Sequence, residues 1–80
     1  MNIEERLIHF AESGNQQKII LANGEQLQGW IMEITDDALL ISTGFNDKVG
    51  KDYWINFADL STAQLSYWDS QIQAWQTFIL

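Results

Sequence analysis

The dipeptide Asn23-Gly24 separates two runs of β-branched and other apolar side chains, and it constrains the fold more than any other feature. Both residues tolerate the left-handed backbone of a type I′ turn, so Asn-Gly between such runs is the strongest short-range indication of a β-hairpin. It predicts antiparallel strands over residues 18–22 and 25–34. Gly29 lies inside the second strand and permits a sharp bend or a close backbone approach, because it has no side chain.

Further apolar stretches downstream have the length and composition of strands. A tight turn at Thr35-Asp36-Asp37 precedes the first of them, and a longer, glycine-containing connection precedes the second. Eighty residues bury one core and leave no room for a second domain. We therefore expect a mainly β fold in which residues 1–80 form one domain, with a five-stranded, strongly bent barrel over residues 17–67. The additional strands are expected at residues 38–43, 53–57 and 62–67.

The chain starts with helical rather than strand periodicity. Asn2 can cap a helix, and Glu5, three residues later, completes a capping box. Gly14 is a typical residue just past a helix end. We therefore expect an N-terminal helix over residues 2–12. Its apolar side is made by Ile3, Leu7, Phe10 and Ala11.

The segment 68–80 is rich in tryptophan and glutamine. Its apolar residues follow the spacing i, i+4, i+7, i+11, which is typical of an amphipathic helix. We therefore expect a C-terminal helix in this segment. The residues that follow the spacing are Trp68, Ile72, Trp75 and Ile79.

Eleven acidic and four basic residues give the chain a formal net charge of −7 at pH 7. Tight non-specific binding to nucleic acid depends on Lys and Arg, so this balance disfavours nucleic acid and favours a basic partner. The absence of cysteine excludes disulfides and thiolate metal sites. Because there is neither a secretion signal nor a stretch approaching ~20 apolar residues, we expect a cytoplasmic protein with no membrane partner.

No arrangement of side chains predicts catalysis or a bound cofactor. His9 is the only histidine and has no Ser or Cys signature near it, so a surface or packing role is favoured over acid–base chemistry. Asp36 and Asp37 are typical turn formers, and the spaced oxygen ligands of a calcium loop are missing around them. We expect no enzyme activity, no cofactor and no metal site.

Residues 21–29 read Leu-Ala-Asn-Gly-Glu-Gln-Leu-Gln-Gly. This stretch resembles the first motif of the Sm-like family, and residues 34–37 are similar to the hydrophobic-then-acidic turn that follows it. The resemblance covers residues 3–67. It implies an SH3-like or Sm-like barrel and a homo-oligomeric ring, in which the fourth strand of one subunit pairs with the fifth strand of the next. The chain looks like a divergent member that lacks the usual RNA-binding residues, because only Tyr53 matches the Tyr-Lys-His motif of the bacterial RNA chaperones.

The predicted fourth and fifth strands contain neither lysine nor proline. Edge strands without such guards are stable when they are paired, and tryptophan and tyrosine are enriched at interfaces. We therefore expect a subunit interface made by Tyr53, Trp54, Ile55 and Phe57 on one strand and by Leu65 and Tyr67 on the other. Aromatic rings also stack on bases. The candidates for contact with a ligand or RNA are Trp30, Lys48, Lys51 and Tyr53.

These observations leave three functional hypotheses. The first is a non-enzymatic Sm-like module that self-associates into a ring and serves as a binding or scaffold protein. The second is an RNA-binding regulator of the Sm type. The third is an acidic inhibitor or immunity-type protein that binds a basic partner.

Overall fold

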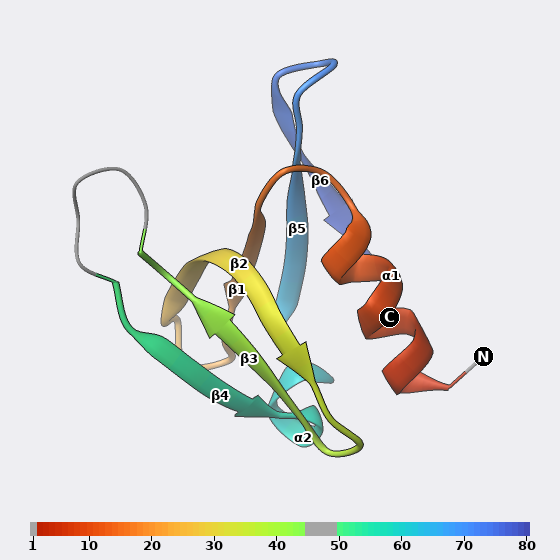
Figure 1. The fold of residues 1–80 in the computed structure, drawn as a ribbon, viewed down its shortest axis with the longest axis vertical. Helices are drawn as coiled ribbons and strands as arrows, with labels where there is room; N and C mark the ends of the chain where they lie inside the picture. Colours follow the sequence, from red (N-terminus) through yellow and green to blue (C-terminus); the bar gives the residue numbers. More distant parts are fainter. Residues whose placement is uncertain (1, 45–49) are drawn as a thin grey trace.

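The computed structural model is mainly β, with an N-terminal helix and one antiparallel sheet. It describes residues 2–44 and 50–80, and within them the sheet has six strands in the order β4-β3-β2-β1-β5-β6 (Figure 1). In chain order the elements are α1 (Ile3–Glu12), β1 (Gln17–Ile20), β2 (Gln26–Ile34), β3 (Ala38–Ser42), β4 (Asp52–Asn56), α2 (Phe57–Leu60), β5 (Gln64–Asp69) and β6 (Ala74–Phe78).

Helix α1 lies where the sequence predicts it. The side chain of Asn2 accepts a hydrogen bond from the backbone N–H of Glu5 at 2.8 Å, which satisfies an amide that the first turn leaves free. Beyond the end of the helix, Gly14 has a φ of 63°, the left-handed conformation expected there. Leu7 and Phe10 are fully buried. The short helix is therefore held by docking its apolar side on the sheet.

Strands β1 and β2 form the predicted hairpin. Gly24 adopts a φ of 90°, and the N–H of Leu21 donates to the carbonyl of Glu25 at 2.8 Å. Strand β2 then bends away from β1 and continues alongside β3 (Figure 1). A β carbon at Gly29 would lie 1.9 Å from the carbonyl oxygen of Ser42, so only glycine fits this close approach of β2 and β3.

The core lies between α1, α2 and one side of the sheet. Burial alternates along β3, where Leu39 and Ile41 are fully buried and Leu40, between them, is half-buried on the opposite face. Phe78 of β6 packs against this core and contacts Phe10 of α1, with ring centroids 5.2 Å apart. The buried apolar residues are Leu7, Phe10, Ile19, Leu27, Leu39, Ile41, Ile55, Leu60 and Leu65.

The C-terminal segment contains a strand, so the helix expected over residues 68–80 is wrong. Strands β5 and β6 form a hairpin in which Trp68 lies directly opposite Trp75, and the two rings meet edge to face at 5.6 Å. At the turn, the N–H of Gln71 donates to the carboxylate of Asp69, and Gln73 has a φ of 52°. As a strand, this segment satisfies the backbone groups along the second side of β5, which a helix would leave unpaired.

The sheet also differs from the expected five-stranded barrel. It has six strands in the described residues, and it is open, because no pairing joins β4 at one end of the strand order to β6 at the other. The strand that the sequence predicts at one edge, β5, lies between β1 and β6. The edges of the sheet are therefore β4 and β6.

Candidate interface at the edge of the sheet

Strand β4 has one paired side and one open side. Its only partner among the described residues is β3. The N–H of Thr43 donates to the carbonyl of Lys51 at 3.0 Å, and the N–H of Phe57 donates to the carbonyl of Asp37 at 2.9 Å. Because antiparallel strands bond through alternate residues, the odd-numbered residues 51–57 direct their backbone groups towards β3. Asp52, Trp54 and Asn56 direct theirs away from the sheet.

The side chains of β4 alternate in the same way. Ile55 is 4% exposed and belongs to the core, whereas Trp54 is 55% exposed on the opposite face. Tyr53 is half-buried opposite Ile41 of β3. The open backbone edge of β4 therefore lies beside an exposed indole.

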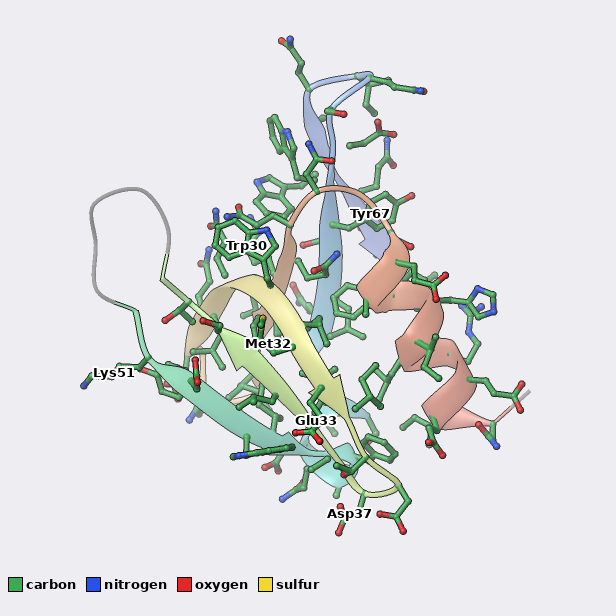
Figure 2. The ribbon with its side chains drawn as sticks, viewed as in Figure 1. Trp30, Met32, Glu33, Asp37, Lys51 and Tyr67 are labelled. Carbon is green, nitrogen blue, oxygen red and sulfur yellow. The ribbon has the colours of Figure 1, made fainter. Side chains whose placement is uncertain are left out.

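Trp54 belongs to a larger apolar surface, which we call the outer patch. Leu40 of β3 lies directly opposite Trp54, and Trp30 of β2 is on the same face because it is opposite Ser42, two residues from Leu40. The ladder between β2 and β3 shifts register at Met32, which is 63% exposed (Figure 2). The outer patch consists of Trp30, Met32, Leu40 and Trp54, and the exposed Glu33 of β2 lies on the same face, directly opposite Leu40.

Leu40 and Met32 were not among the interface residues expected from the sequence. For Leu40 a sequence pattern was available, because the alternation in β3 places it on the face opposite Leu39 and Ile41. For Met32 there was none, since a bulge cannot be read from the alternation of one strand.

The second expected interface strand is placed differently from the prediction. β5 is paired on both sides, so it is not an edge strand. Leu65 is 3% exposed and packs in the core, and the ring of Tyr67 lies beside Gly14, next to the end of α1 (Figure 2). Phe57 is half-buried at the start of α2. Of the expected interface residues, Trp54 is the one that combines an outward backbone with an exposed side chain.

The candidate ligand contacts do not converge on one point. Figure 2 shows Lys51 at the start of β4, well away from Trp30 on β2. Tyr53 lines a shallow hollow of ≈280 Å³ with Gln28 and Thr43 among its neighbours. Lys48 lies outside the described residues.

Among residues 2–44 and 50–80, no group of three or more His, Cys, Asp and Glu side chains is arranged to bind a metal. A hollow of ≈500 Å³ between β5, β6 and the end of α2 has no titratable side chain in its lining. Its walls include Leu60, Phe78 and Leu80.

Comparison of the chain with protein-family models, curated sequences and solved structures finds no match. The Sm-like resemblance over residues 3–67 therefore stays a prediction from the sequence. Within the part of the chain that the structure describes, no helix has the length and apolar character needed to cross a membrane.

Proposed function

We propose that this chain is a non-enzymatic module that self-associates through the open edge of β4 and serves as a binding or scaffold protein. The observation that supports this most is the outward backbone of Asp52, Trp54 and Asn56 beside an indole that is 55% exposed. Unpaired strand edges are templates for further pairing, and natural proteins protect them with lysine, proline or a covering element. Strand β4 contains neither lysine nor proline, and its one charged residue is Asp52 at its start.

The Sm-like resemblance suggested a ring in which the fourth strand pairs with the fifth strand of a neighbour. Here β6 lies along the side of β5 that such a neighbour would use. A ring of that kind requires β6 to leave β5, so we propose assembly through β4 without that exchange. The SH3-like or Sm-like barrel stays a prediction from the sequence, because the six-stranded sheet of the described residues is open.

Light scattering coupled to size exclusion tests the proposal. At micromolar concentration the mass is expected to exceed the 9.2 kDa of one chain. Trp54→Glu places a charge at the edge and is expected to lower the mass with an unchanged circular dichroism spectrum. Ile72→Glu is the matched control, since Ile72 is also 55% exposed but lies in the turn between β5 and β6. A monomer throughout the concentration range would refute the proposal.

A second candidate function is binding of a basic protein partner. The net charge of −7 favours it, because long-range attraction then steers a cationic surface towards the chain. Binding in pull-down experiments should weaken strongly as salt is raised. If binding does not respond to salt, this candidate fails.

RNA binding is the weaker alternative. Two of the four basic side chains make contacts within the chain: Arg6 donates to the carbonyl of Ile79, and Lys18 lies 4.2 Å from the centre of the Trp75 ring. Among the described residues this leaves Lys51 as the exposed basic side chain for phosphate contacts. Titration of A-rich and U-rich oligonucleotides at low salt tests this alternative, and we expect no binding.

A further inference from the structure

We infer that the partner of β4 is the β4 strand of a second copy, running antiparallel about a two-fold axis that passes through Trp54. This inference rests on the proposed function and specifies its partner and symmetry. It predicts a dimer with a continuous sheet across both copies. The Sm-type ring would instead need different strands to meet at each contact.

The outward backbone groups of β4 complement themselves in this register. When Trp54 lies opposite Trp54 of the second copy, each N–H donates to the other carbonyl. Asp52 then lies opposite Asn56 of the second copy, and the backbone N–H of that Asn56 donates to the backbone carbonyl of Asp52. The Asn56 carbonyl is the group that the first bond of α2 uses, because Asn56 is the N-cap of that helix. The pairing therefore uses the groups that the fold leaves available.

Charge also selects this register. A slip that placed Asp52 opposite Asp52 of the second copy would oppose like charges, which destabilises a cross-strand pair. A slip that placed Trp54 opposite Asn56 would leave Asp52 without a partner. The register centred on Trp54 is the one that pairs every outward residue of β4 and keeps the carboxylates apart.

The same arrangement joins the outer patches. Trp54 lies at the rim of the sheet and Leu40 lies directly behind it on β3. A two-fold axis at Trp54 brings the two indoles together, with Leu40 of each copy on their flanks. Trp54, which is 55% exposed in one copy, then packs against its counterpart with Leu40 beside it.

Strand β6, the other edge, is the less suitable partner for β4. The N–H of Trp68 donates to the carbonyl of Gln16, so the even-numbered residues of β5 direct their backbone groups towards β1 and the odd-numbered ones towards β6. By the pairing of β5 with β6, the residues whose backbone groups point away from the sheet are Trp75, Thr77 and Ile79. The carbonyl of Ile79 already accepts a hydrogen bond from Arg6 of α1. The helix thus occupies one end of the β6 edge (Figure 1).

Cysteine trapping tests the symmetry, because the chain contains no cysteine. Residues directly opposite each other in a bonded antiparallel pair have Cα atoms about 5.5 Å apart, within the range of a disulfide. Under mild oxidation Trp54→Cys is expected to form a disulfide-linked dimer of twice the 9.2 kDa chain. Thr77→Cys, on the outward side of β6, is the control and is expected to stay monomeric under denaturing conditions. No disulfide at position 54 in a protein that is oligomeric would overturn the inference.

A charge exchange provides an independent test. Trp54→Glu and Trp54→Lys each oppose like charges across a two-fold axis, so each variant alone is expected at the monomer mass. Mixed in equal amounts they should form a heterodimer, with at least a tenfold gain in association over either variant alone. If the mixture stays monomeric, or if native mass shows a trimer or larger ring, the two-fold arrangement is wrong while self-association stands. If the unmodified chain is itself monomeric, the proposed function fails as well.

Discussion

The guanidinium of Arg6 lies 4.8 Å from the centre of the Phe78 ring and so connects the first helix to the last strand. The same ring contacts Phe10, whose side chain is fully buried. Strand β6 is thereby attached on its core side to α1 as well as along its backbone to β5. This double attachment explains why the C-terminal hairpin is part of the fold and covers the side of β5 that an Sm-type neighbour would need.

Replacing Phe78 should weaken this attachment. Truncation of a buried phenylalanine costs about 3–5 kcal/mol, and because Phe78 is half-buried we expect Phe78→Ala to lower the free energy of unfolding by about 2 kcal/mol. Urea denaturation followed by circular dichroism measures the change. Thr77→Ala, on the exposed side of the same strand, should cost no more than about 0.5 kcal/mol. Equal effects of the two substitutions would mean that β6 does not pack on α1.

Two glycines should respond to alanine for different reasons. At Gly29 the new methyl would lie 1.9 Å from the Ser42 carbonyl, so the strands must separate and we expect a loss of about 2–3 kcal/mol. At Gly24 no atom lies within 4 Å, and only the φ of 90° opposes a side chain, at about 1 kcal/mol. Thermal unfolding of both variants gives the ranking. A larger loss at Gly24 than at Gly29 would contradict the close approach of β2 and β3.

Gln17 is a buried polar residue, and replacing it with glutamate should make the stability of the fold depend on pH. Its side chain is 3% exposed, and its amide nitrogen donates to the carbonyls of Ser13 at 2.6 Å and Ala11 at 3.3 Å. Gln17→Glu replaces the donor with a carboxylate facing two carbonyl oxygens. Burial and these oxygens should raise the pKa of the new carboxyl above its ordinary value of about 4.3.

The sign of the pH dependence follows from that shift. The folded state of Gln17→Glu binds its proton more tightly than the unfolded state, so its stability relative to the unmodified chain should fall as pH rises from about 4.3 through the raised pKa. At pH 7 we expect a loss of about 3 kcal/mol, and at pH 4 a loss nearer 1 kcal/mol. Chemical denaturation at several pH values measures it. Gln17→Leu should lose about 1–3 kcal/mol with no such dependence on pH.

Salt should strengthen self-association. Each chain has a net charge of −7, so two copies repel at long range while the β4 contact itself opposes no like charges. Raising the ionic strength from ~0.01 M to ~0.15 M shortens the Debye length from about 30 Å to about 8 Å and should lower the dissociation constant several-fold. Sedimentation equilibrium at both salt concentrations measures this. A dissociation constant that rises with salt would instead indicate a contact between opposite charges.

The sequence alone predicted the helix cap, the hairpin turn and the strand alternation, which are specified by residues close together in the chain. Asn2 accepts the capping bond that its position predicts, and Gly24 has the left-handed backbone that the Asn-Gly hairpin requires. The alternation in β3 correctly separates buried Leu39 and Ile41 from Leu40. In each case the deciding interactions lie within a few residues of one another.

The tertiary structure decided the rest. Trp68, Trp75 and Ile79 fit a helical spacing, yet in the fold the two tryptophans face each other across a hairpin. The helical spacing does not reveal that this segment pairs with the second side of β5, or that Phe78 contacts Phe10 and Arg6 of the first helix. Pairing with β5 and the contacts of Phe78 with the first helix outweigh the helical propensity of this segment, and among the described residues they leave β4 paired on one side only.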